Sequence, residues 1–155
     1  VVIGFGLIFW GVVLFVADRV SHKNTAIRPL EQVNWKQTLF IGCAQAIALI
    51  PGTSRSGVTM TAGLFSKFDK KSAAEFSFLM SVPVIALAGA LKVFELFEVG
   101  LVNISFFALA VGFVVSALSG LVAIAGLMKI IQKWSFTPFV VYRIIVGVLI
   151  LIFLV

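Results

Sequence analysis

The chain has 155 residues, of which 61% are hydrophobic and 12% are charged, whereas a soluble domain usually carries about 25% charged residues. Twelve lysines and arginines against six acidic residues give a formal net charge of +6. The basic residues flank long apolar runs and form no stripe with aromatic residues between them, so we exclude nucleic-acid binding and expect an integral membrane protein.

The apolar runs predict membrane-spanning helices in chain order. Residues 1–17 would form a helix about 25 Å long, just short of a hydrocarbon core of roughly 30 Å. The chain starts at Val1 without a signal pattern, so we interpret this run as a truncated transmembrane helix of a longer protein. Residues 76–97, 104–128 and 136–155 are each long enough to span.

Two shorter apolar arms, residues 38–50 and 58–65, flank the loop PGTSRSG. As helices they would measure about 20 and 12 Å, so neither spans alone. They form either one broken spanning helix or a re-entrant hairpin over residues 38–66. The hairpin leaves nine basic residues on one side and only Lys92 on the other, whereas a broken span divides them five to five. The positive-inside rule favours a hairpin that opens from the cytoplasmic side.

The loop has the chemistry of an anion site. Pro51 and Gly52 end the first arm, because proline lacks an amide donor and glycine permits unusual dihedrals. Ser54 or Ser56 then caps the second arm, whose first amides attract anions. Arg55 adds a planar fork of donors that suits phosphate oxygens. The other candidate binding residues of the loop are Thr53, Gly57 and Thr59.

Alternatives remain open at three positions. Arg55 could instead pair with a carboxylate inside a broken transporter helix. Arg143, near the start of the last helix, snorkels to the cytoplasmic edge, makes a second phosphate contact, or pairs with a carboxylate in the half of the protein that this chain lacks. Gln45 either donates into the same cavity or joins two helices. No carboxylate lies in the loop, so this segment offers no obvious general base.

Other residues are expected to serve structure alone. Cys43 should pack as a small apolar group on its helix. Ser72 and Glu75 match a capping box before the next apolar run. Small residues that recur every four positions predict a face for close helix packing; they are Ala108, Gly112, Ser116 and Gly120.

Four stretches resemble the bacterial undecaprenyl-diphosphatase family, also called bacitracin resistance proteins. They are Gln45–Thr59 (QAIALIPGTSRSGVT), Glu75–Phe78 (EFSF), Val82-Pro83 and Pro138–Arg143 (PFVVYR). Their order and spacing match from about Trp35 to the end of the chain. The resemblance implies hydrolysis of undecaprenyl diphosphate to the monophosphate in the bacterial plasma membrane, which recycles the lipid carrier for cell-wall synthesis. It also implies an all-α integral membrane fold built as an inverted repeat, with this chain as the second half.

The resemblance maps the family's arginine-bearing motif onto Ser54, Arg55 and Ser56, and implies that Arg55 holds the diphosphate. A divalent cation, magnesium or calcium, would assist. The family's other motif has two glutamates, a Ser-Ser-Thr-Gly stretch and a histidine, and is absent here; His22 does not stand in that context. The chain alone is therefore expected to be a half-site without useful activity.

Two rival functions fit the same residues. A lipid-phosphate transporter or flippase would keep the arginine and the short helices but release no phosphate. A non-catalytic anion-binding subunit would bind the diphosphate and do neither. The expected partners are undecaprenyl diphosphate and the lipid bilayer, and a homodimer is compatible with the resemblance.

Overall fold

The computed structural model describes residues 1–21, 30–99 and 105–153, and its regular elements are helices. They are α1 (Val2–Ser21), η1 (Leu30–Gln32), α2 (Trp35–Ala46), η2 (Ile47–Leu49), α3 (Arg55–Phe65), α4 (Lys70–Val99), α5 (Phe106–Trp134) and α6 (Thr137–Phe153). Three of them, α1, α4 and α5, are long and apolar enough to cross a membrane, and α6 is a shorter apolar helix. The prediction of an all-α integral membrane protein is confirmed.

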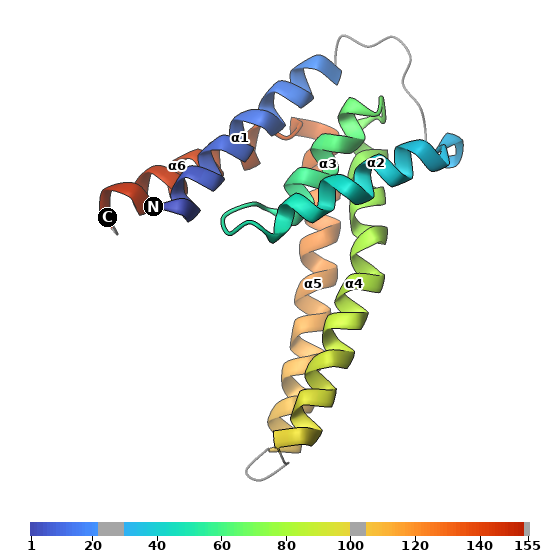
Figure 1. The fold of residues 1–155 in the computed structure, drawn as a ribbon, viewed down its shortest axis with the longest axis vertical. Helices are drawn as coiled ribbons and strands as arrows, with labels where there is room; N and C mark the ends of the chain where they lie inside the picture. The colour runs from blue at the N-terminus through green and yellow to red at the C-terminus, as the bar shows by residue number, and fades with distance from the viewer. Residues whose placement is uncertain (22–29, 100–104, 154–155) are drawn as a thin grey trace.

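The helices form two groups (Figure 1). The long helices α4 and α5 run as a hairpin that projects away from the rest of the molecule, while α1 and α6 lie side by side at an angle to it. The shorter helices α2 and α3 lie beside one another near the base of the α4–α5 hairpin, and α3 packs against both α1 and α4. Helix α3 is therefore the centre of the fold.

Glycines allow α1 and α6 to approach closely. A Cβ at Gly147 would lie 2.9 Å from the carbonyl oxygen of Gly4 and 2.7 Å from the side chain of Ile8. Further along, a Cβ at Gly11 would lie 3.6 Å from the Cβ of Arg143. A side chain at Gly147 would push the helices apart, whereas at Gly11 the distance is an ordinary van der Waals contact, so the first turns of α6 pack against the middle of α1.

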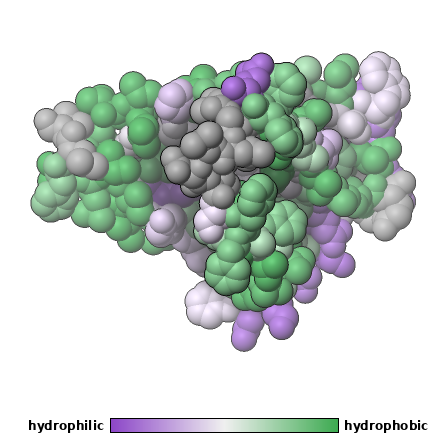
Figure 2. All heavy atoms as spheres, turned by 90° about the horizontal axis from the view of Figure 1, so that it is seen from below, coloured by the Kyte–Doolittle hydropathy of each residue, from purple (hydrophilic) through white to green (hydrophobic). Residues whose placement is uncertain are grey.

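The buried core lies where α1, α2, α3, the start of α4, the end of α5 and the start of α6 meet. Its members include Leu14, Ala17, Ile41, Met60, Leu64, Phe68, Ala74, Ile131, Phe136 and Val140. The apolar segments of α4 and α5 lie outside this core, because only 6% of the segment in α4 and none of that in α5 is buried within the chain. Figure 2, which views the molecule from the free end of the α4–α5 hairpin, shows apolar side chains over much of this face. An apolar surface of this extent requires lipid or protein around it.

Helix α4 begins earlier than the sequence predicted, and the expected capping box at Ser72 is wrong. Asp69 is the cap: its carboxylate accepts the backbone N–H of Ser72 at 2.7 Å and the Ser72 hydroxyl at 2.7 Å. Glu75 instead pairs with Lys71 across one turn, at 3.6 Å. An aspartate one residue before Lys70 caps the first turn directly, so the helix needs no later start.

Two packing expectations are also wrong. Cys43 is exposed on α2 and is not packed. On α5, ideal Cβ atoms at Gly112 and Gly120 would meet nothing within 4 Å, so no described helix packs closely at these two positions of the predicted face. Helix α5 also continues to Trp134, six residues beyond the predicted end. His22 lies outside the described residues.

The predicted arms appear as α2 with η2, and as α3, joined by a turn at residues 50–54. Asn34 and Gln37 form a reciprocal capping box at the start of α2. Entry of this helical hairpin into the bilayer from one side stays a prediction.

Candidate anion-binding site at the start of α3

The turn before α3 requires a glycine. Gly52 has φ = +85°, a region that side-chain-bearing residues rarely adopt. A Cβ at this position would also lie 2.7 Å from the carbonyl oxygen of Ile3 and 2.8 Å from its Cα. The turn therefore rests directly on the first part of α1, and this contact fixes where α3 begins.

Ser54 is the N-cap of α3, as the sequence allowed. Its Oγ accepts the backbone N–H of Gly57 at 3.2 Å, and its carbonyl accepts the N–H of Val58 at 2.9 Å. The Ser56 hydroxyl lies 3.3 Å from the Ser54 hydroxyl. Two hydroxyls thus gather at the positive end of the helix, where an anion is stabilised.

Arg143 reaches this end of α3 from α6. The residue is only 7% exposed, so the structure excludes simple snorkelling to the edge of the fold. Its Nη1 lies over the backbone of Gly57, since a Cβ there would be 2.5 Å away. The Nε and Nη2 atoms are buried and have no hydrogen-bond partner among the described residues. Buried guanidinium donors without acceptors are costly, so Nε and Nη2 favour an acceptor, such as an anion, from outside the described residues.

A cavity of about 210 Å³ joins these groups. Its polar lining comes from Ser54, Ser56 and Arg143, with the backbone of Gly57 between them. The remaining walls are mostly apolar and consist of Leu14, Met60, Leu127, Ile131, Phe136, Phe139 and the aromatic ring of Tyr142. A few donors within low-polarity walls strengthen any charge interaction made there.

Arg55 lies on another side of the first turn of α3 and does not line this cavity. Its Nε donates to Oε1 of Gln45 at 3.1 Å, and its Nη2 donates to the carbonyl oxygen of Met80 at 3.1 Å. Within the described residues Arg55 therefore bridges α2 and α4 through neutral acceptors, and its carboxylate-paired alternative is not observed.

The threonines of the loop have separate places. Thr59 is buried in α3, where its hydroxyl donates to the carbonyl of Arg55 at 3.0 Å and lies 2.6 Å from the Ser77 hydroxyl on α4. It therefore joins two helices away from the cavity. Thr53 lies in the turn, where its N–H donates to the carbonyl of Ile50, and its buried hydroxyl has no partner among the described residues.

Of the nine predicted site residues, the structure brings Ser54, Ser56, Gly57 and Arg143 together around one cavity. It places Arg55 with Gln45 on another side of the turn, and Gly52, Thr53 and Thr59 in supporting positions. The aromatic wall from α6 was missed. Its signal was present, because Phe136, Phe139 and Arg143 recur at helical spacing on one face.

Together, the fold and the cavity define an α-helical integral membrane protein with a cationic pocket at a helix N-terminus. The chain belongs to the bacitracin resistance protein BacA family, whose sequence model matches residues 1–149.

Curated relatives agree with this assignment. The chain is 45% identical over 150 residues to "Undecaprenyl-diphosphatase 2" of Stutzerimonas stutzeri, which covers 97% of this chain and 53% of the relative. It is 44% identical to "Undecaprenyl-diphosphatase 1" of Pseudoalteromonas translucida, over 99% of this chain and 56% of the relative. The "Undecaprenyl-diphosphatase" of Magnetococcus marinus is 47% identical over 92% of this chain and 52% of the relative. The chain thus spans about half the length of these relatives.

Proposed function

We propose that this chain supplies the phosphate-binding part of an undecaprenyl-diphosphatase. The reaction is hydrolysis of undecaprenyl diphosphate to undecaprenyl phosphate and inorganic phosphate, which recycles the lipid carrier for cell-wall synthesis. The observation that carries the proposal is the buried Arg143 beside the capped N-terminus of α3, because its Nε and Nη2 have no acceptor in the part of the chain that the structure describes. The names of the relatives supply the substrate.

In the proposed reaction, a water oxygen attacks the terminal phosphorus, and the bond from this phosphorus to the bridging oxygen breaks. The lipid monophosphate leaves with that oxygen. Such a transition state spreads negative charge over the phosphate oxygens. Arg143, the first amides of α3 and the hydroxyls of Ser54 and Ser56 would neutralise this charge within a cavity of low polarity.

Arg55 also binds the diphosphate in this proposal, as the family motif implies, but from a different side of α3 than Arg143. A diphosphate has two phosphate groups, and the first turn of α3 has one arginine on each of two sides. We assign one phosphate to Arg143 within the cavity and the other to Arg55, whose Nε is held by Gln45. Gly52 and Thr53 shape the turn between the two arginines.

A divalent cation, magnesium or calcium, is part of the proposal. When bound, it would withdraw charge from the diphosphate. The described residues contain no group of three or more His, Cys, Asp or Glu side chains that could hold a metal ion, so they assign no step to a metal on this chain. Its ligands and the general base would come from the length of the relatives that this chain does not span, and the chain alone would then be inactive.

The proposed location is the bacterial inner membrane. The chain would cross it several times, with the connection between α3 and α4 toward the cytoplasm. A homodimer is a further expectation, which light scattering of the purified protein in detergent would test.

The test is release of inorganic phosphate from undecaprenyl diphosphate, in detergent with magnesium, by the protein at the full length of its relatives. Arg55→Ala is measured beside it, and Lys92→Gln is the control because Lys92 pairs with Glu95 on the exposed far part of α4. Release that collapses only in Arg55→Ala supports the hydrolase. Bound lipid diphosphate without release would instead favour a transporter or flippase.

A further inference from the structure

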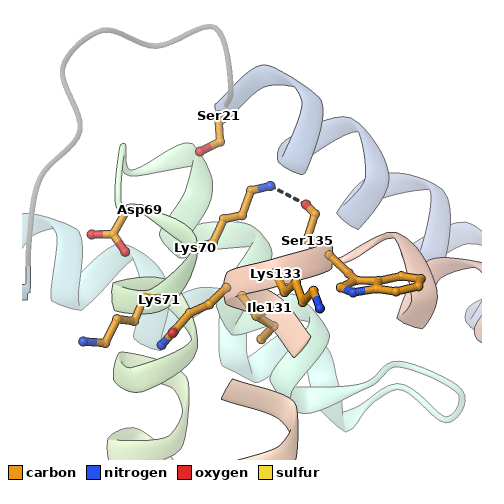
Figure 3. Close-up of a pocket in the computed structure, with 9 residues that line it drawn as sticks. Ser21, Asp69, Lys70, Lys71, Ile131, Lys133 and Ser135 are labelled. Atoms are coloured by element: carbon orange, nitrogen blue, oxygen red, sulfur yellow. Dashed lines mark hydrogen bonds between the residues drawn. The ribbon is translucent and has the colours of Figure 1, made fainter. Parts of the chain in front are cut away.

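Three polar residues from distant parts of the chain meet beside α6. Lys70, the first residue of α4, pairs with Asp18 of α1, with 3.2 Å between Nζ and Oδ1. Ser135, between α5 and α6, donates its hydroxyl to Oδ2 of Asp18 at 2.6 Å and accepts from Nζ of Lys70. Figure 3 shows Lys70 reaching across to Ser135, at one wall of a hollow of about 620 Å³. We call these three residues the triad.

The two charged members of the triad, Asp18 and Lys70, are largely buried. The side chain of Asp18 is 4% exposed and that of Lys70 is 20% exposed. Moving two such charges out of water costs about as much as their attraction returns, so a buried ion pair contributes little net stability compared with apolar side chains of similar size. What the triad supplies is a defined position for the third member, Ser135.

Ser135 has an unusual backbone. Its φ is +67° and its ψ is −165°, a region where residues other than glycine are strained and persist only when their surroundings fix them. Here the side chain is held by Asp18 and Lys70, and the backbone N–H donates to the carbonyl of Ile131 at 3.2 Å. The triad therefore fixes the direction in which the chain leaves α5.

That direction sets the position of α6 and its arginine. Phe136 follows Ser135 directly, is 1% exposed, and accepts the backbone N–H groups of Phe139 and Val140. Arg143 follows seven residues later, about 10 Å further along the axis of α6. Leu14, one turn before Asp18 on α1, lines the same cavity as Phe136 and Arg143. The triad thus ties together two walls of the phosphate cavity.

We propose that Asp18, Lys70 and Ser135 are positioning residues that hold Arg143 against the N-terminus of α3. This inference rests on the proposed function, in which Arg143 binds a phosphate. None of the three lines the cavity, so they act through α6 and not by touching substrate.

The first test variant is Ser135→Gly. Glycine accepts a positive φ without strain, so the backbone stays foldable while the hydroxyl that joins Asp18 to Lys70 is lost. We expect phosphate release, measured as kcat/KM, to fall about 10- to 100-fold, the size expected from a small misplacement of a catalytic group. Lys92→Gln, at the other end of α4, is the matched control and should leave kcat/KM unchanged.

The second variant removes the charges together. Asp18→Leu with Lys70→Met replaces a buried ion pair by apolar side chains, a change that proteins often tolerate without losing stability. We expect a thermal midpoint in detergent close to that of the unchanged protein, and a fall in kcat/KM like that of Ser135→Gly. A folded double variant with unchanged kcat/KM would overturn the proposal.

A double-mutant cycle separates positioning from general structure. If Ser135 acts through Arg143, then Ser135→Gly should cost little further activity once Arg143→Lys is present. Equal fold losses in both backgrounds would contradict the proposal.

Amide hydrogen exchange gives a readout independent of turnover. Ser135→Gly should speed exchange in residues 137–143 and leave the exchange rates of the α2–α3 turn unchanged. Faster exchange in residues 137–143, in a protein whose unchanged form releases no phosphate, would support the positioning role and contradict the proposed function. Unchanged exchange in residues 137–143 would contradict the positioning role.

Discussion

The guanidinium of Arg143 lies against the backbone of Gly57, so closely that a Cβ at residue 57 would stand 2.5 Å from Nη1. The contact brings the last helix onto the N-terminus of α3. Residue 57 is therefore glycine because an arginine occupies the space of its side chain.

Gly57→Ala should fold and lose function. The atom that a new methyl group meets first is the far end of a flexible side chain, so Arg143 can move aside, but it then leaves the phosphate cavity. We expect phosphate release to fall about 10-fold or more, with little change in the thermal midpoint. Gly42→Ala is the control, because a Cβ at this position on α2 meets nothing within 4 Å. Equal activity in the two variants would contradict the role of the contact.

Arg143→Met should stabilise the ligand-free protein. Methionine keeps the apolar stem and removes buried donors that have no partner within the described residues. The cost of such unsatisfied groups is about 1–3 kcal/mol, and part of it should return as a higher free energy of unfolding in detergent. An arginine that serves structure would give the opposite result, a lower thermal midpoint in Arg143→Met.

Arg55→Ala should remove much of the transition-state stabilisation, and Arg55→Lys should recover only part of it. Loss of one charge-stabilising donor group costs about 10²- to 10³-fold in kcat. Lysine keeps the charge but cannot reproduce the fork that meets Gln45 and the Met80 carbonyl at once. Steady-state rates of phosphate release would show the order, and near-normal turnover by either variant would remove Arg55 from the mechanism.

Gly52→Ala should destabilise the fold itself. The new side chain would face both a positive φ and the backbone of Ile3 on α1, which cannot move aside as a side chain can. We expect a loss of about 1–3 kcal/mol in unfolding free energy, seen as a lower thermal midpoint. Gly42→Ala again serves as the control, and an unchanged midpoint in Gly52→Ala would show that the turn does not depend on this contact.

The local structure of the site could be predicted from the sequence. The sequence predicted that Pro51-Gly52 ends the first arm and that Ser54 or Ser56 caps α3, because turn and cap preferences depend on a few neighbouring residues. The structure selects Ser54. These features need no knowledge of how distant helices pack. For Gln45 the sequence left two alternatives open, and the structure shows the one in which it joins two helices, since its Oε1 accepts from Nε of Arg55 on α3.

The placement of the two arginines could not be predicted in this way. The place of Arg143 depends on the packing of α6 against α1, whose close approach Gly4 and Gly147 allow. The direction of Arg55 depends on α2 and α4, which supply its acceptors. The triad was missed for the same reason, since Asp18 and Ser135 are 117 residues apart. An aspartate that ends an apolar run was its only local signal.

The most direct test of the cavity is the rate of phosphate release from undecaprenyl diphosphate by Arg143→Met, compared with the unchanged protein at full length. We predict that kcat/KM falls about 100-fold or more while the variant stays folded. A folded Arg143→Met variant that releases phosphate at the normal rate would contradict the claim that this cavity binds the phosphate.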